Sequence, residues 1–317
     1  MTADLTAKIF HDEDAAREHF QALRWPNGSV CPHCGSVGNA TEMKGRTTRP
    51  GLFKCKEREC RKPFSATMGT LYERSHIPLH KWLLATHLMC ASKKGISTHQ
   101  LYRMLGFGSY KTAWFMAHRI RAAMTETNPA PLGGPGKVVE VDETYVGGKE
   151  GNKHANKHAN KRAATKDVFG PKEAVVSLVE RKGEVRSFHV ANVTWKTLRP
   201  IIVKHASRQS HLMTDGARLY PAVGREFASH SSVDHSRGEY VREGFHHSNT
   251  VENFFSILKR GVIGTYHHVS EAHLSRYLAE FDFRYNSRLV TDRERAANAV
   301  SGVVGKRLTY HQPRQAA

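Results

Sequence analysis

Three acidic residues stand where metal-dependent chemistry could take place. Asp142 lies in the apolar stretch KVVEVDETYV, Asp215 ends the stretch HLMTD, and Glu252 lies near the start of the amphipathic stretch TVENFFSILKRG. Mg²⁺ and Mn²⁺ prefer a few carboxylate oxygens and keep positions open for substrate phosphate. Two such ions about 3.5–4 Å apart can activate an attacking oxygen and stabilise the leaving oxygen. The three acids are therefore candidate ligands for catalytic Mg²⁺ or Mn²⁺.

Each acid also has an ordinary structural explanation when it is taken alone. Asp142 can be a polar strand residue with Glu143 as the more important neighbour, and Asp215 can form a turn in TDG. Glu252 can be the third residue of a capping box that begins at Asn249. The three explanations are less satisfactory together, because all three acids fall at the ends of elements in a basic domain. We therefore favour the metal-binding interpretation.

The elements that carry the acids follow a Pro- and Gly-rich linker, TETNPAPLGGPG. Strands followed by alternating helices and strands indicate an α/β or α+β domain around a mixed sheet. The pattern of apolar residues predicts a strand at 137–146, a hairpin over 173–190 that turns near Lys182 and Gly183, a helix at 195–206 and a strand at 211–215.

The stretch TVENFFSILKRG predicts an amphipathic helix. Its apolar residues have i, i+3, i+4 and i+7 spacing, which leaves Glu252 and Lys259 on a neighbouring face two turns apart. An acid that binds metal and a base that binds phosphate would then face the same side. The apolar stripe consists of Val251, Phe254, Phe255 and Leu258.

The composition favours a polyanionic partner. The chain has 317 residues, 39% of them hydrophobic, and a formal net charge of +19 with its basic residues spread along the whole length. Such a charge is typical of nucleic-acid-binding proteins, and it would hold DNA phosphates against a cluster of acids. The basic insert KHANKHAN, residues 153–160, predicts a flexible loop that either touches phosphates or is simply solvated.

No segment indicates a membrane. The longest apolar runs fall short of the roughly 18 residues of a membrane span, and the acidic start of the chain does not match a secretory signal. The five cysteines are therefore expected to remain thiols in a reducing compartment.

Four of the cysteines have the spacing of a zinc site. Cys31 and Cys34 form a C-x2-C pair, and Cys55 and Cys60 form a C-x4-C pair about 20 residues further on. The polar segment between them has little apolar surface around which to fold without a metal. Four thiolates leave no position for water, so the spacing predicts a structural Zn²⁺. A redox pair or chance clustering is the weaker alternative.

Residues 78–124 have helical periodicity, which Gly106 and its neighbours in GFGS interrupt. Ser97 can cap the helix before this turn, and the second helix has an apolar side. The layout is that of a helix-turn-helix, although two helices around a Gly turn are common in any α domain. Basic residues off the apolar side would face a major groove, namely Lys111, His118, Arg119 and Arg121.

Several motifs together resemble those of bacterial insertion-sequence transposases of the ISXO-like group. They are RWPNGSVCPHCGS, VDETYVGG, TDGARLY and HHSNTVENFFSILKRGVIGTYHHVS with HLSRYLAEFDFRYN. The resemblance covers roughly residues 10 to 290, and the long last motif is the most specific. It implies an amino-terminal zinc ribbon, an RNase H-like DDE domain, and metal-dependent cleavage and joining of DNA at the ends of the element.

The resemblance also implies residue roles. Asp142 and Asp215 match the first two catalytic acids of the group. The third falls in SNTVEN, where the group has either an acid or Asn, so Glu252 and Asn249 are both candidates. We favour Glu252, because a carboxylate is the better ligand for Mg²⁺ and Asn249 is better placed to cap the helix. Lys259 matches a basic residue that would contact the DNA backbone.

We therefore expect a multidomain α+β protein with a zinc ribbon, a helix-turn-helix-like region and an RNase H-like α/β domain with a mixed sheet. The expected divisions are an N-terminal helix and zinc ribbon at 1–65, a helical DNA-binding region at 66–128, a linker at 129–136, the DDE domain at 137–290 and a C-terminal tail at 291–317.

The expected function is that of a transposase acting on double-stranded DNA, at transposon ends and at target DNA. The resemblance places it in the bacterial cytoplasm at the nucleoid, as a homo-oligomer in the synaptic complex, with Lys259 and Arg260 on the DNA. The alternative is a non-catalytic DNA-binding regulator, either domesticated or decayed, that keeps the zinc and helical modules. The sequence leaves open whether transposition is cut-and-paste or copy-type.

Overall fold

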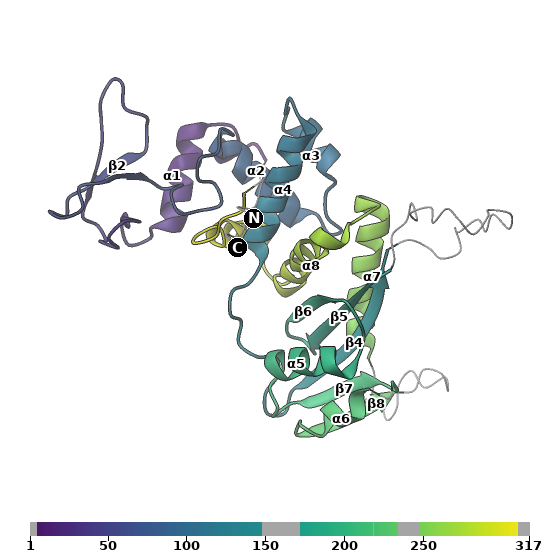
Figure 1. The fold of residues 1–317 in the computed structure, drawn as a ribbon. Coiled ribbons are helices and arrows are strands. Elements are labelled where there is room, and N and C mark those ends of the chain that lie inside the picture. Colours follow the sequence, from purple (N-terminus) through teal and green to yellow (C-terminus); the bar gives the residue numbers. More distant parts are fainter. Residues whose placement is uncertain (1–4, 148–171, 218, 234–247, 310–317) are drawn as a thin grey trace, which may run out of the picture. The chain divides into compact units, whose positions relative to one another are not determined.

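The computed structural model describes residues 5–147, 172–217, 219–233 and 248–309. The predicted basic loop at 153–160 lies outside these residues. The chain forms two compact units, one of residues 1–126 with 287–317 and one of residues 127–286 (Figure 1). The second unit is thus inserted in the sequence of the first.

The first unit begins with a short 3-10 helix η1 (Lys8–Phe10) and helix α1 (Glu13–Arg24), whose N-terminus is capped by Asp12. A three-stranded antiparallel sheet follows, in which Trp25 packs edge-on against two phenylalanines. This small aromatic cluster is the apolar part of the ribbon. The strands are β1 (Ala40–Glu42), β2 (Leu52–Cys55) and β3 (Pro63–Ser65), and the two phenylalanines are Phe53 and Phe64.

The helical part of the first unit has the predicted helix-turn-helix layout. Ser97 caps α3 by accepting from the N–H of Gln100, as its position predicts, and a turn through Gly106 leads to α4. The predicted apolar side of α4 is buried. The helices are α2 (Leu79–Ala91), α3 (Thr98–Met104) and α4 (Tyr110–Met124), and the buried side consists of Ala113, Ala117, Ile120 and Met124.

The segment expected to form a C-terminal tail contains a helix, α9 (Asp292–Ser301). Thr291 and Glu294 form a capping box at its start, and α9 packs against α1, α2 and α4. At its end, a Cβ on Gly302 would lie 2.3 Å from the carbonyl oxygen of Ala123, so glycine permits this close approach. The stretch DRERAANAVS offers few large apolar residues, which is why hydrophobic periodicity does not reveal the helix.

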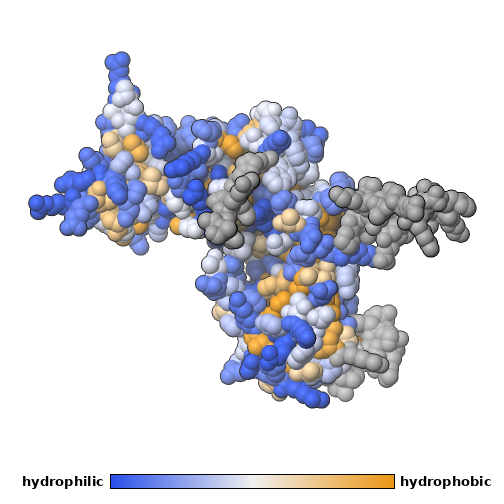
Figure 2. All heavy atoms as spheres, viewed as in Figure 1, coloured by the Kyte–Doolittle hydropathy of each residue, from blue (hydrophilic) through white to orange (hydrophobic). Residues whose placement is uncertain are grey.

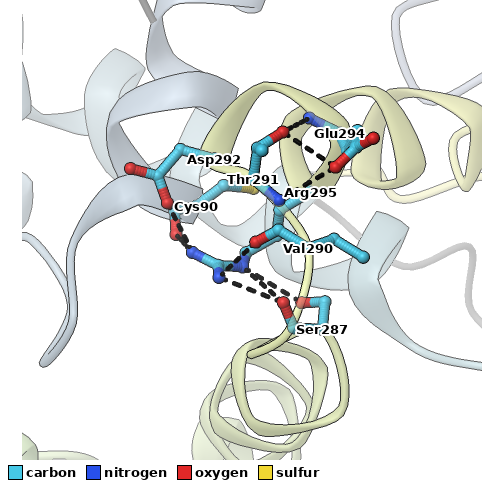
Figure 3. A network of polar contacts seen from close by, with 7 residues as sticks. All are labelled: Cys90, Ser287, Val290, Thr291, Asp292, Glu294 and Arg295. Atoms are coloured by element: carbon cyan, nitrogen blue, oxygen red, sulfur yellow. Dashed lines mark hydrogen bonds and ion pairs between the residues drawn. The ribbon is translucent and has the colours of Figure 1, made fainter. Parts of the chain in front are cut away.

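Arg295 ties α9 to the C-terminal end of α2 (Figure 3). Its guanidinium donates to the carbonyl oxygens of Cys90 at 3.0 Å, Ser287 at 3.0 Å and Val290 at 3.3 Å. It also pairs with Asp292 at 2.7 Å, and its side chain is only 12% exposed. Arg295 therefore satisfies carbonyl groups from two separate segments of the first unit.

The second unit is built on a five-stranded mixed sheet of order β6-β5-β4-β7-β8. The strands β4, β5 and β6 pair antiparallel, whereas β7 and β8 add in parallel. This order and these directions are RNase H-like, which confirms the predicted fold class. The strands are β4 (Val138–Val146), β5 (Glu173–Glu180), β6 (Val185–Val190), β7 (His211–Asp215) and β8 (Ser229–Val233); the polar stretch SHSSV of β8 carries no strand signal in the sequence.

Helices cover both faces of this sheet. Successive side chains of a strand point to opposite faces, so one strand can contribute apolar side chains to both layers of helices. On β4, Val139 and Val141 pack with α5 and α6, whereas Val146 packs with α7 and α8. Figure 1 shows these helices beside the sheet. The central strand is therefore buried on both sides. The helices are α5 (Trp195–His205), α6 (Tyr220–Gly224), α7 (Asn249–Gly261) and α8 (Glu271–Asn286), and a π-helical turn η4 (Val262–Tyr266) follows α7.

Within the described ranges, none of the helices combines the length and apolar character that a membrane crossing requires. In the view of Figure 2, hydrophilic residues are spread over the surface of each unit instead of gathering at one end.

Replacing Arg295 with Ala should destabilise the first unit. Hydrogen bonds to charged groups contribute about 1.5–3 kcal/mol each, and the variant loses several of them, so we expect a loss of about 3 kcal/mol. Differential scanning calorimetry of the full chain would show the transition at a lower temperature. Arg293→Ala is the matched control, because Arg293 is an exposed residue of the same helix. Equal unfolding temperatures of the two variants would contradict the role of Arg295.

Candidate active site and zinc cluster

Asp142 and Asp215 lie side by side because β4 and β7 pair in parallel. Glu140 pairs with Met213. Asp142 follows Glu140 by two residues, and Asp215 follows Met213 by two residues, so the same register places the two aspartates next to each other. Residues in register on parallel strands project to the same face of a sheet. The two acids therefore share the face that α7 and α8 cover.

Glu252 reaches the same place from the first turn of α7. Its Oε1 accepts a hydrogen bond from the hydroxyl of Ser248 at 3.1 Å, and its side chain is exposed. Burial raises the pKa of Asp142 to about 7, and the carboxylates of Glu143, Asp215 and Glu252 also raise it. The three sequence-predicted acids therefore lie close enough for their charges to interact, a repulsion that a cation would relieve, although their carboxylate oxygens do not all lie within 4.8 Å of one another.

Glu143 lies on the opposite face of β4 and belongs to a different contact. Its Oε2 accepts a hydrogen bond from the hydroxyl of Tyr220, the first residue of α6. Burial raises the pKa of Glu143, and burial with the nearby Glu143 carboxylate raises the pKa of Tyr220. The phenol therefore stays protonated and donates. Tyr220 is the last residue of the motif TDGARLY, and its place in that motif is the feature of the sequence that could have indicated its role.

The cap of α7 differs from the sequence prediction. Asn249 is the first residue of the helix and is exposed, and Ser248 precedes it as N-cap residue. The N–H groups of Thr250 and Val251 donate to Glu140 on β4, at 2.9 Å and 3.0 Å. Glu140 is not among the residues predicted from the sequence. Its signal was an acid within the apolar alternation of VVEV, at a position facing α7.

The four predicted zinc ligands form one cluster in the first unit. Their sulfur atoms all lie within 4.8 Å of one another, with Sγ–Sγ distances of 3.8 Å for Cys31–Cys60 and 3.6 Å for Cys34–Cys55. A tetrahedral zinc with Zn–S bonds of about 2.3 Å requires sulfurs about 3.8 Å apart. The donor set and its spacing therefore fit a structural Zn²⁺.

Two protein families match the two units. A model described as a transposase zinc-ribbon domain matches residues 11–63, and one described as an ISXO2-like transposase domain matches residues 131–286. Together the two ranges cover well over half of the chain. The chain thus carries a transposase zinc-ribbon domain and an ISXO2-like transposase domain.

Individual proteins resemble this transposase over different lengths. An "uncharacterized protein in transposable element ISH50" of Halobacterium salinarum is 29% identical over 283 residues, which are 87% of this chain and 92% of that protein. An "uncharacterized transposase-like protein" of Haemophilus influenzae is 29% identical over 106 residues, 33% of this chain and 84% of that protein.

A solved structure is more distantly similar. A chain of the simian T-cell lymphotropic virus intasome, in complex with PP2A regulatory subunit B56 gamma, is 16% identical over 57% of the transposase. The match spans 63% of that chain with a TM-score of 0.29, a likeness too weak to support any conclusion.

The basic residues expected on DNA differ in their surroundings. Lys111, Lys259 and Arg260 are exposed. Arg119 is partly buried, where it donates to the carbonyl oxygen of Leu308 at 3.2 Å. The other two basic residues of α4, Arg121 and His118, have 0% exposure, so the prediction that they face a groove is wrong. They are buried because α4 packs against α2, α3 and α9 and leaves little of its surface free.

A second group of potential metal ligands lies elsewhere on the described part of the second unit. Ligand atoms of Glu173, His189 and Glu271 come within 4.8 Å of one another. Nε2 of His189 and Oε2 of Glu173 lie 2.7 Å apart, at hydrogen-bond distance, and Glu271 is the exposed first residue of α8. Two of the three potential ligands therefore already contact each other, and the third is an exposed acid.

Removing one cysteine of the cluster should abolish zinc binding. Native mass spectrometry of the wild-type transposase is expected to show one bound zinc, and Cys31→Ser to show none, because three thiolates bind zinc far more weakly. Cys90→Ser is the control, since it removes a buried thiol of α2 outside the cluster. A wild-type spectrum that shows no bound zinc would contradict the zinc assignment.

Asp142→Asn should stabilise the protein at alkaline pH in buffer without divalent cations. The folded pKa of about 7 lies above the ordinary value of 3.8, so the folded state holds the proton more tightly. Wild-type stability is therefore lost as pH rises from about 4 to about 7, and the neutral amide escapes this loss. Thermal unfolding should show a larger advantage of the variant at pH 8 than at pH 4.5, about 2 kcal/mol or more. A difference that does not grow with pH would contradict the prediction.

Proposed function

We propose that this chain is a DDE-type transposase that binds the ends of its insertion sequence and catalyses divalent-metal-dependent DNA cleavage and strand transfer. The observation that carries the proposal is the convergence of Asp142, Asp215 and Glu252 on one face of an RNase H-like sheet. Their oxygen donors suit Mg²⁺ or Mn²⁺, and burial together with the neighbouring carboxylates raises the pKa of Asp142 to about 7.

In this proposal the three acids hold the metal ions, which would polarise the attacking and leaving oxygens at the scissile phosphate. Asp142 and Asp215 supply ligands from rigid neighbouring strands. Glu252 supplies one from a helix whose exposed face also carries Lys259. Lys259 follows Glu252 by seven positions on α7, which is about two helical turns, so acid and base share a side. Lys259 and Arg260 bind the DNA backbone there.

In this proposal the first unit supplies DNA binding and the second unit supplies the chemistry. Its zinc cluster is structural, because four thiolates leave no position for water or substrate. Exposed Lys111, at the start of α4, is the helix-turn-helix residue best placed for a phosphate or a base edge. Since two transposon ends are joined in one reaction, we propose that the active form is a homo-oligomer.

A non-catalytic DNA-binding regulator is the alternative function. It needs the zinc cluster and the helices but makes no use of three converging carboxylates. Strand-transfer activity therefore separates the two functions, whereas DNA binding does not.

Asp142→Asn and Asp215→Asn should each abolish cleavage and strand transfer while DNA binding stays nearly unchanged. Each change removes a metal ligand and leaves the basic surface intact. The assay uses Mg²⁺ or Mn²⁺ with DNA carrying the repeats that flank the gene, and gel-shift titration measures binding. Glu226→Gln is the control, because Glu226 is a carboxylate of the same unit that pairs with Arg199. A fully active aspartate variant would exclude that residue as a ligand.

The same assay decides the third ligand. Glu252→Gln is expected to lose activity by orders of magnitude, whereas Asn249→Ala should retain it, because Asn249 is exposed and Glu140 caps the helix. If Glu252→Gln is active and Asn249→Ala is folded but inactive, Asn249 and not Glu252 is the third ligand.

A further inference from the structure

Glu140 is a completely buried carboxylate on β4. Its Oε1 accepts from Nε of Arg181 at 2.6 Å and from Oγ1 of Thr250 at 2.8 Å. Its Oε2 accepts from the N–H groups of Thr250 at 2.9 Å and Val251 at 3.0 Å. A carboxylate offers about four lone-pair positions, and these four donors fill them. Glu140 is therefore suited to hold protein groups in place and not to bind a metal ion.

These contacts lie close to both sides of the acid cluster. Glu140 precedes Asp142 by two residues on the same face of β4, and Thr250 precedes Glu252 by two residues on α7. The junction between strand and helix is thus two residues away from a candidate metal ligand in each element.

The helix cannot position itself in the usual way, because its own N-cap residue is used elsewhere. The first N–H groups of a helix are ordinarily satisfied by the side chain of the N-cap residue. Here the hydroxyl of Ser248 donates to Glu252 instead, and Ser248 makes no side-chain cap bond. Glu140 supplies the acceptor from the neighbouring strand, and its negative charge also suits the positive end of the helix dipole.

Apolar packing alone would not fix this geometry. Val251 and Phe254 press α7 onto the sheet, but apolar contact is not directional and allows small shifts along the helix axis. Hydrogen bonds to two successive N–H groups fix the start of the helix in both position and rotation.

We infer that Glu140 is a positioning residue that sets the start of α7 so that Glu252 completes the metal site formed with Asp142 and Asp215. This inference rests on the proposed metal-dependent function. Glu140 acts through α7, and Arg181 and Thr250 complete its hydrogen bonds.

The test is the concentration of Mn²⁺ that gives half-maximal strand transfer by the full-length protein on DNA carrying the flanking repeats. Glu140→Gln keeps the size of the side chain but replaces one acceptor oxygen with an NH2 group that faces donors. Loss of a residue that orients metal ligands typically weakens metal affinity about 10–100-fold. We expect the half-maximal Mn²⁺ concentration to rise about tenfold or more, at a temperature well below unfolding.

Glu280→Gln is the matched control for a purely structural effect. Glu280 is also completely buried, pairs with Arg284, and accepts from the hydroxyl of Tyr266 at 2.7 Å in the same unit. Its replacement should lower the unfolding temperature but leave the Mn²⁺ requirement within about twofold of wild type. Equal shifts in the Mn²⁺ requirement for the two variants would overturn the inference.

Two further variants separate the outcomes. Thr250→Val removes only the hydroxyl contact to Glu140 and should also raise the Mn²⁺ requirement, by a smaller factor. If Glu140→Gln does not fold, Thr250→Val alone tests the inference. Full activity of Asp142→Asn would refute the proposed function itself. An inactive Asp142→Asn together with wild-type Mn²⁺ requirements in both Glu140→Gln and Thr250→Val would refute only the role of Glu140.

Discussion

The parallel pairing of β4 with β7 is the constraint on which the candidate site depends. A shift of one residue in this register would turn Asp215 to the opposite face, away from Asp142. The register is held because β4 is buried on both faces, with Val141 in one apolar core and Val146 in the other. Any slip would place polar side chains such as Glu140 among apolar ones, so the packing that stabilises the sheet also aligns the acids.

The site combines groups whose charges oppose one another. Asp142, Asp215 and Glu252 crowd negative charge into one place, and this is part of the reason why the pKa of Asp142 rises to about 7. The chain as a whole carries a net charge of +19, which attracts DNA over distances of about a Debye length. Without a cation the cluster would repel the phosphate that the rest of the surface attracts. A metal-bound cluster and a basic surface are therefore two parts of one electrostatic arrangement.

The sequence predicted those features that follow from local periodicity. The apolar stripe of α7 and the cap of α3 at Ser97 are both found, because spacing along one element decides them. Features decided by contacts between distant segments were missed. Arg121 looked exposed because α9, which covers part of α4, has too few large apolar residues to be recognised. Glu140 was missed for the same reason, since its partners lie on the β5–β6 turn and on α7.

Both ends of the described chain contribute to the first unit, and this changes how its C-terminal segment should be understood. The N–H of Leu71 donates to the carbonyl oxygen of Val303 at 3.1 Å, and Nζ of Lys306 donates to the carbonyl oxygens of Ala123 at 2.9 Å and Thr125 at 2.5 Å. The last two carbonyls belong to the C-terminal end of α4, where a cation is favourable. The segment after residue 287 thus completes the core around the helix-turn-helix. Because the whole second unit lies between these partners in the sequence, the first unit can reach its final packing only after the second unit has been synthesised.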